Sequence, residues 1–233
     1  MTTASTLRQH PAPAPVELRG LTLDVGGGST RRRLLDDVHH AFPSGAVSCI
    51  LGVSGAGKTS LLKVIAGLAQ RTAGAVLVDG SDVTEYTAKQ RLRLRRTSVA
   101  MVYQQYNLIE TLTALENVSL APELAGDRRP VAKQKARVAL AELGLADAHH
   151  RLPATLSGGE QQRVALCRAM AGPHSVVLAD EPTGALDDAN GEIVVQALRE
   201  LAKRGKCCIV VTHNQTVARA ADHVATLTNG KLV

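Results

Sequence analysis

Residues 52–59 have the types and the spacing that a phosphate-binding loop requires. Glycines allow backbone N–H groups to converge on phosphate oxygens at the start of a helix. Lys58 adds a cation for the β- and γ-phosphates, and Thr59 offers a hydroxyl to Mg²⁺. The alternative is a tight glycine turn with a surface lysine, but the strand expected before the loop and the helix expected after it favour phosphate binding. The segment that matches G-x-x-x-x-G-K-[ST], together with the next residue, reads Gly52, Val53, Ser54, Gly55, Ala56, Gly57, Lys58, Thr59 and Ser60.

Two adjacent carboxylates, Asp180 and Glu181, follow the apolar run 176–179. They are expected at the carboxyl edge of a parallel sheet, where doubly wound folds bind ligands. Two carboxylates at the end of a buried strand are costly to ionise, and Mg²⁺ next to Asp180 would compensate. Glu181 would then orient or deprotonate a water molecule. Alone, the pair would fit a helix cap or a loop charge equally well, but the phosphate loop favours a reactive site.

Residues 157–160 open a helix with the S-x-x-E spacing of a capping box. Capping explains Ser157 and Glu160. It does not explain Gly158 and Gly159, because glycine in the first turn weakens a helix by up to about 1 kcal/mol at each position. Bare backbone at a helix N-terminus allows an anion to approach closely. We therefore expect Ser157, Gly158 and Gly159 to contact an anionic ligand.

The pattern of apolar residues predicts an α/β fold around these segments. From residue 157 onward helix and strand alternate, which is typical of βαβ units and a parallel sheet covered by helices. Strand 47–51 leads into the phosphate loop, and Leu61, Val64, Ile65 and Leu68 give the next helix one apolar face. The other expected elements are an antiparallel sheet with a glycine-rich turn over 16–42, strands 98–103, 175–179 and 206–211, helices 131–145, 160–170 and 188–203, and a hairpin at 226–233 that turns at Asn229-Gly230.

Composition is that of a globular chain. The 233 residues are 45% hydrophobic, and no apolar run reaches the ~20 residues of a spanning helix. The net charge of +6 is scattered, and with one Phe, three Tyr and no Trp a nucleic-acid stacking surface is not expected. The four cysteines lie in apolar runs and predict buried, reduced thiols. Residues 1–15 lack the apolar segment of a secretory signal and are expected to form a flexible tail.

Three segments together resemble the nucleotide-binding domain of ABC ATPases: GVSGAGKT at 52–59, LSGGEQQR at 156–163 and VVLADEPTGALD at 176–187. The resemblance covers residues 16–233. It implies a P-loop NTPase core with a parallel sheet, an N-terminal antiparallel β subdomain and a helical insert subdomain at about residues 105–171. It also implies ATP and Mg²⁺ as cofactors, and hydrolysis of ATP to ADP and phosphate.

The resemblance assigns further residues. Gln104 matches the glutamine that contacts Mg²⁺ and water, with Gln105 as the other possible register. His213 matches the histidine that contacts the γ-phosphate, and Asp187 matches the aspartate that crosses a dimer interface. The implied catalytic residues are Glu181, His213 and Gln104, and the implied metal ligands are Thr59, Gln104 and Asp180.

The resemblance also implies partners. Two subunits, as a homodimer or as paired ATPases, would join head to tail, so that Ser157, Gly158 and Gly159 serve the nucleotide of the other subunit. The dimer would dock on a transmembrane permease, which places it in the cytoplasm at the inner face of the cell membrane. Residues 104–118 look like the lipoprotein-release and macrolide-export group. The alternative is a signalling complex of the cell-division type; a nucleic-acid ATPase is disfavoured because two cassettes or long insertions are missing.

One position departs from the family pattern. The family places an aromatic residue in the N-terminal sheet to stack on adenine, and this sequence has Val25 there. No aromatic residue precedes Phe42. Weak recognition of the base is therefore expected, unless Phe42 or a residue of the partner covers it.

Overall fold

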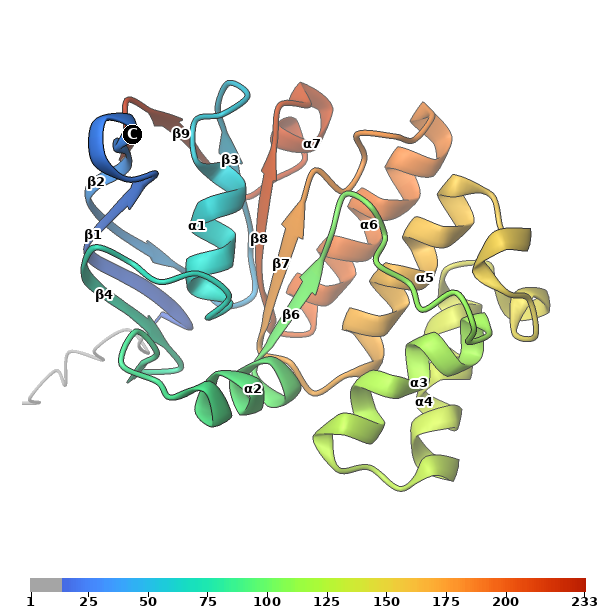
Figure 1. Cartoon of the computed structure of the whole chain (residues 1–233). Coiled ribbons are helices and arrows are strands. Elements are labelled where there is room, and N and C mark those ends of the chain that lie inside the picture. Colours follow the sequence, from blue (N-terminus) through green and yellow to red (C-terminus); the bar gives the residue numbers. More distant parts are fainter. Residues whose placement is uncertain (1–13) are drawn as a thin grey trace, which may run out of the picture.

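Two β-sheets form the frame of the structure, a computed structural model that describes residues 14–233. Figure 1 shows an antiparallel sheet at one side and a mainly parallel sheet through the centre, with strand orders β2-β1-β4-β5 and β10-β9-β3-β8-β7-β6. The antiparallel sheet contains β1 (Val16–Val25), β2 (Arg32–Phe42), β4 (Ala73–Val78) and β5 (Ser81–Asp82). The central sheet contains β3 (Val47–Leu51), β6 (Val99–Val102), β7 (Val176–Asp180), β8 (Cys207–Thr212), β9 (His223–Thr228) and β10 (Lys231–Leu232).

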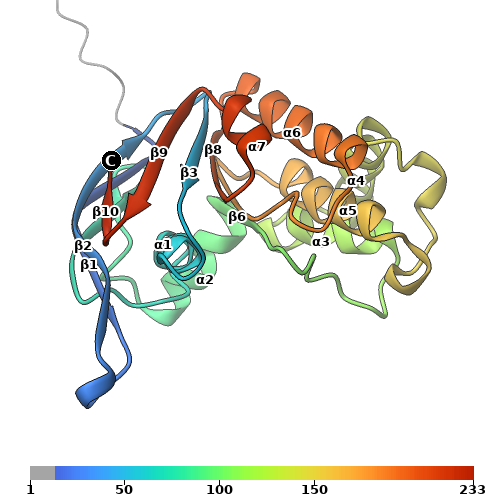
Figure 2. The same cartoon turned by 90° about the horizontal axis from the view of Figure 1, so that it is seen from above.

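Helices cover both faces of the central sheet (Figure 2). Helices α1 and α2 lie on the face that also meets the antiparallel sheet, whereas α6 and α7 lie on the other face. Helices α3, α4 and α5 pack together beyond the edge strand β6. The helices are α1 (Lys58–Ile65), α2 (Ala88–Thr97), α3 (Ala114–Ala125), α4 (Arg129–Glu142), α5 (Gly158–Ala171), α6 (Asp188–Lys203) and α7 (Gln215–Arg219), with 3₁₀ turns η1 (Gly28–Thr30), η2 (Ala146–Ala148) and η3 (Pro153–Thr155).

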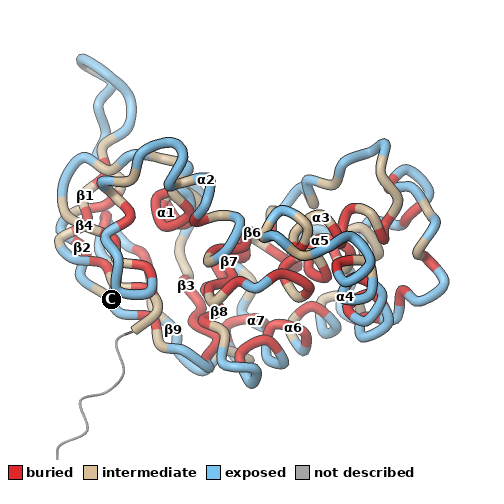
Figure 3. The backbone as a smooth tube through the Cα atoms, turned by 90° about the horizontal axis from the view of Figure 1, so that it is seen from below, coloured by how far each residue is buried: buried red, intermediate tan, exposed pale blue. Residues whose placement is uncertain are grey.

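Alternate residues of the central strands enter two separate cores. In β8, Cys207, Ile209 and Val211 pack with α1 and the antiparallel sheet, while Cys208 and Val210 pack with α6. Successive side chains of a strand point to opposite faces, so a strand covered on both faces needs a continuous apolar run. Figure 3 shows these buried segments, in red, along the central strands and the inner sides of the helices.

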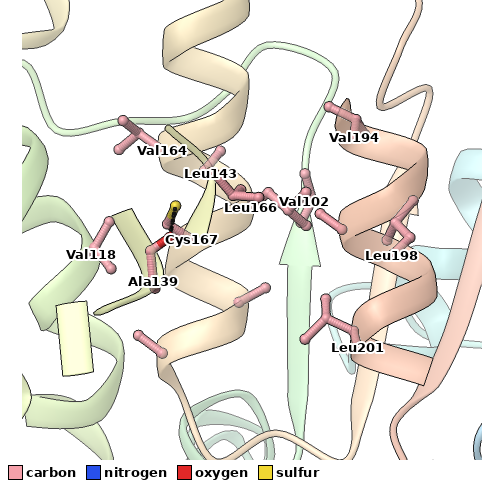
Figure 4. Packing of buried hydrophobic residues seen from close by; sticks show 14 of the residues in the cluster. Val102, Val118, Ala139, Leu143, Val164, Leu166, Cys167, Val194, Leu198 and Leu201 are labelled. Carbon is pink, nitrogen blue, oxygen red and sulfur yellow. Dashed lines mark hydrogen bonds between the residues drawn. The ribbon is translucent and has the colours of Figure 1, made fainter. Parts of the chain in front are cut away.

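The core under α6 continues into the helices beyond β6 (Figure 4). Leu166 and Cys167 on α5 belong to the same buried cluster as Ala139 on α4 and Leu198 on α6. The Cys167 thiol donates to the carbonyl oxygen of Ala139 at 3.1 Å. One apolar core therefore joins the helical region to the central sheet.

The predicted strands 47–51, 98–103, 175–179 and 206–211 are confirmed to within one residue at each end, whereas the predicted hairpin at 226–233 has a longer first strand, β9, which begins at His223 and also pairs with β3. Helix α6 occupies the predicted range 188–203, and β7 and β8 are each displaced by one residue from their predicted ranges. Strands β3, β8, β7 and β6 pair in parallel, as the βαβ pattern requires. Asn229 and Gly230 have φ values of 50° and 79°, which the predicted type I′ turn demands.

Several features differ from the prediction. The helix predicted at 131–145 is α4, which ends at Glu142, because Gly144 leaves the helical region with φ 69°. Leu68 does not extend the apolar face of α1: it is 43% exposed and lies beyond the helix end, because Gly67 leaves the helical region with φ 65°. The N-terminal sheet is also larger than predicted, since β4 and β5 join it. A side chain at Gly74 in β4 would overlap the carbonyl oxygen of Gly20, so glycine permits the close approach of β4 to β1.

The structure also bears on the predicted tail, the cysteines and membrane-spanning helices. Of the predicted tail, only residues 14 and 15 are among the described residues, and the carbonyl oxygen of Pro15 accepts a hydrogen bond from Asp79 N at 2.9 Å. All four cysteines are buried and unpaired, as predicted. Burial raises the pKa of Cys49 to about 11 and those of Cys207 and Cys208 to about 12. Over residues 14–233, no helix is both long and apolar enough to cross a membrane.

Protonation of buried His174 should destabilise the protein at mildly acidic pH. Burial, aided by the positive charge of Lys206, lowers the pKa of His174 to about 4. The unfolded chain takes up this proton near pH 6.5, so stability is complete above that pH and falls as the pH drops toward 4, with about 2 kcal/mol lost at pH 5. Urea unfolding at neutral pH and at pH 5 measures the difference.

His174→Gln should remove that share of the pH dependence, because glutamine does not titrate. The matched control is His150→Gln, which changes an exposed histidine and should retain the pH dependence of the wild type. Equal pH dependence in His174→Gln and the wild type would show that His174 does not resist protonation.

Candidate active site

The loop between β3 and α1 has a backbone shape that depends on glycine. Gly57 caps α1 with φ 105°, and Gly55 has φ 77°, conformations that are strained for any residue with a Cβ atom. The first N–H groups of a helix have no partner within the helix, so they are available to an anion. The loop that the sequence predicted to bind phosphate therefore has the required backbone shape.

Lys58 holds its ammonium group inside a pocket at this loop. Lys58 is 8% exposed, and its Nζ donates to the carbonyl oxygens of Gly52 at 2.5 Å and Val53 at 3.2 Å. The same nitrogen lies 4.0 Å from a carboxylate oxygen of Glu181. One buried cation thus connects the loop after β3 with the residue after β7.

Asp180 ends β7 close to the start of α1. The Thr59 hydroxyl donates to Asp180 Oδ1 at 2.9 Å, and Asp180 is 7% exposed. Burial raises the pKa of Asp180, against the opposite effect of the hydrogen bond from Thr59. A buried carboxylate beside a hydroxyl is an oxygen donor set that suits Mg²⁺, and a bound cation would offset the cost of ionising the acid.

Glu181 is fixed by contacts from the end of β8. Its Oε2 accepts hydrogen bonds from the Thr212 hydroxyl at 2.8 Å and from His213 N at 3.3 Å, and its Oε1 lies 2.9 Å from His213 Nδ1. Glu181 has φ 46°, a left-handed conformation that costs energy in a residue with a side chain. Such strain is typical of residues that are held in place for function.

A pocket of about 620 Å³ brings most of the predicted residues together. Gln104 lines it and Gln105 does not, which favours the first of the two registers considered from the sequence. Asp180 does not line the pocket itself, but it accepts a hydrogen bond from Thr59, which does. The lining residues are Leu34, Val53, Ser54, Gly55, Ala56, Gly57, Lys58, Thr59, Ser60, Gln104, Glu181 and His213.

The segment 157–159 does not line this pocket. Ser157 caps α5 as predicted: its hydroxyl accepts from Glu160 N at 3.2 Å, and Ser157 N donates to Glu160 Oε2 at 2.7 Å. The glycines also have neighbours within the chain, since a Cβ at Gly158 would lie 2.9 Å from the Tyr106 hydroxyl. Tyr106 is a side chain that can shift, so this contact alone does not demand glycine.

Asp187 is likewise outside the pocket of its own chain. It caps α6, where its Oδ1 accepts from the backbone N and the side-chain amide of Asn190, each at 2.8 Å. These hydrogen bonds lower the pKa of the Asp187 carboxyl. Asn190 also accepts from the Arg163 guanidinium, which ties α6 to α5. This contact between Asn190 and Arg163 was not predicted from the sequence.

Two further residues of the site, Leu34 and Thr212, were not predicted from the sequence. Leu34 lies against the phosphate loop, 3.3 Å from where a Cβ at Gly57 would be. Thr212 holds Glu181 and also accepts from Asn214 N at 3.0 Å. The only sequence signal for Thr212 was its place between an apolar strand and His213, whereas Leu34 carries no signal at all because its position depends on how two sheets meet.

Comparison with known proteins agrees with this geometry. Residues 35–184 match the family model described as ABC transporter. An uncharacterized ABC transporter ATP-binding protein of Mycobacterium tuberculosis is 42% identical over 219 residues, which cover 94% of this chain and 88% of that protein. The macrolide export ATP-binding/permease protein MacB of Escherichia coli is 36% identical over 218 residues, which are 94% of this chain but only 34% of MacB.

The fold also matches a solved structure. The dimeric structure of MJ0796, a bacterial ABC transporter cassette, superposes with a TM-score of 0.87 at 34% identity, covering 93% of this chain and 96% of that one. A second structure of MJ0796, in a post-hydrolysis state bound to ADP and phosphate, gives the same values. The chain therefore belongs to the ABC transporter family, as an ATP-binding cassette that hydrolyses ATP.

Proposed function

We propose that the chain powers a separate membrane permease of the export type by hydrolysing ATP at the pocket between β3, β7 and β8. The observation that carries this proposal is the convergence of Lys58, Glu181 and His213 on the phosphate loop. A permease partner is supported by the likeness to MacB, whose name includes a permease, although the chain spans only about a third of that protein. As cargo we propose lipids, lipoproteins, peptides or drugs; the name of MacB mentions macrolides.

The residues of the pocket have different roles in ATP hydrolysis. The backbone of residues 54–59 and Lys58 bind the β- and γ-phosphates, and Thr59, Asp180 and Gln104 would hold Mg²⁺, which would supply further neutralising charge. Glu181 orients the attacking water and accepts its proton. His213, next to Glu181, donates a hydrogen bond to the γ-phosphate. Electrostatic stabilisation of this kind is the main means by which phosphoryl transfer is accelerated.

Thr59→Val should lower ATP hydrolysis by at least about tenfold and raise the Mg²⁺ concentration that is needed, because removal of one oxygen donor weakens the metal site. Valine keeps the shape of threonine, so the loop is retained. ATP hydrolysis measured against Mg²⁺ concentration reports the change. Thr97→Val, on the exposed side of α2, is the control. A wild-type Mg²⁺ dependence in Thr59→Val would show that Thr59 is not a metal ligand.

We further propose a head-to-tail dimer at the inner face of the cell membrane. In its support, residues 157–159 and Asp187 are placed away from the pocket of their own chain, as residues that serve a neighbouring subunit would be. MJ0796 is described as a dimer, and its fold is the same.

Co-purification from solubilised membranes tests the permease. An affinity-tagged chain should retain a multi-span membrane protein, and ATP should drive solute movement when the two are placed in vesicles. Recovery of a membrane partner that moves no solute would point instead to a signalling complex of the cell-division type. Recovery of nucleic acid without a membrane protein would contradict the proposal.

A further inference from the structure

Three consecutive arginines begin near the start of β2, and they have different surroundings. Arg31 Nη2 and Arg33 Nε donate to the two carboxylate oxygens of Asp24 at 2.6 and 3.0 Å, and Arg33 also pairs with Asp36 at 3.0 Å. The side chain of Asp24 is only 7% exposed, so these pairs fasten β2 to β1. Arg32 is exposed and, within residues 14–233, makes no ion pair. Its guanidinium is available for another group.

The pairing of β1 and β2 places Arg32 on the inner face of the antiparallel sheet. Leu21 and Leu23 of β1 are buried against the core that contains α1, and Val25, which is 37% exposed, lies two residues farther along β1, past a register shift in the pairing with β2 between Leu23 and Asp24. Arg32 is the residue directly opposite Val25, and opposite residues of an antiparallel pair project on the same side of the sheet. Val25 and Arg32 therefore extend the inner face beyond the core, toward the N-terminal end of α1.

Arg32 also lines a cavity that adjoins the phosphate pocket. This cavity has a volume of about 700 Å³, and Leu34, Val53, Ala56 and His213 are common to its lining and to that of the phosphate pocket. A ligand whose phosphates lie on the loop would therefore border the cavity that Arg32 lines.

The order of the strands fixes the direction in which a nucleotide lies. Glu181 and His213 follow β7 and β8, which stand on one side of β3 in the sheet, so the γ-phosphate must point that way. Strands β9 and β10 stand on the other side of β3, and β10 contacts β2. The nucleoside end would then leave the loop on this second side, where Leu34 and Arg32 line the adjoining cavity.

We propose that the guanidinium of Arg32 stacks on the base of the bound nucleotide and takes the place of the aromatic side chain that Val25 does not provide. This inference rests on the proposed nucleotide site. The guanidinium is planar and weakly hydrated, which lets it lie against an aromatic ring, and Val25 supplies an apolar neighbour. Phe42 cannot cover the base, because it is fully buried at the opposite end of β2.

Arg32→Ala in the full chain should weaken ATP binding by roughly five- to thirtyfold, as expected for the loss of a partly desolvated cation–π contact. Binding of ribose 5-triphosphate, which lacks the base, should not change. Arg32→Lys keeps the positive charge but lacks the planar guanidinium group, so it should bind ATP about as weakly as Arg32→Ala. Isothermal titration with each ligand measures the affinities, and Arg31→Ala, which removes a neighbouring arginine paired with Asp24, is the matched control.

A rescue experiment separates stacking from a general effect of the substitution. Val25→Tyr added to Arg32→Ala should restore most of the lost ATP affinity, because it provides a ring on the same face of the sheet. Unchanged ATP affinity in Arg32→Ala would overturn the inference and leave the base to a residue of the partner. An equal loss for ATP and ribose 5-triphosphate would also overturn it, since Arg32 would then act on the phosphates. If the wild type bound neither ligand, the proposed nucleotide site itself would fail.

Discussion

Glu181→Gln should bind ATP as tightly as the wild type and lose at least about 10²- to 10³-fold in the rate of phosphate release. The substitution removes the group that accepts the proton of the water but keeps the side-chain shape, and Lys58, Thr59 and Asp180 of the phosphate and metal site are untouched. The amide can still bond with the Thr212 hydroxyl, which donates to Glu181 at 2.8 Å. The variant should therefore accumulate with ATP bound, in the proposed dimer.

Two measurements separate this outcome from a structural defect. Single-turnover hydrolysis reports the chemical step, and equilibrium titration with ATP reports binding. Glu192→Gln on α6 is the control, because it removes the same charge from an exposed position. If Glu181→Gln released phosphate at a rate near that of the wild type, Glu181 would not be the residue that activates water.

Lys58→Ala and Ser157→Arg should each abolish turnover as pure proteins and regain activity when mixed. Lys58 serves the phosphates of its own chain, whereas Ser157 lies outside its own pocket and, in the proposed dimer, faces the nucleotide of the other subunit. A mixed dimer places both defects in one composite site and leaves the second intact. Random mixing would then restore up to about a quarter of the wild-type rate, because half of the dimers are mixed and each has one working site.

Binding and fold controls accompany this test. Ser157→Arg also removes a helix cap, which costs about 1 kcal/mol of stability, so its circular dichroism and its retained ATP binding must be measured. Ser81→Arg, an equally bulky change on exposed β5, should keep full activity. Wild-type turnover in Ser157→Arg alone would contradict the trans arrangement, and no recovery on mixing two folded proteins would do the same.

Local patterns were enough to predict strands β3, β6, β7 and β8 of the central sheet and the phosphate loop. The apolar runs of β7 and β8 are continuous because both faces are covered, and this alone marks them as inner strands. The glycines and Lys58 of the phosphate loop occur together within eight residues, so their chemistry is visible in the sequence. Short-range patterns failed where a strand depends on a distant one, as β4 depends on β1.

The candidate site shows the same division. Asp180 and Glu181 were predicted from the end of a strand, but their partners were not, because Thr212 and Leu34 approach from elements far along the chain. From the sequence, Gln104 was favoured over the adjacent Gln105. In the structure Gln104 lines the pocket and Gln105 does not.

The amino-acid sequence by itself determined the phosphate loop, the pair of carboxylates after β7, the capped start of α5 and the family to which the chain belongs, because each depends on residues close together in the chain. Only the tertiary structure decided that Lys58, Glu181 and His213 meet in one pocket, that residues 157–159 lie outside it, and that Arg32 lines the adjoining cavity. These relations depend on strand order and register. Long-range pairing sets both, and no local pattern of residues encodes it.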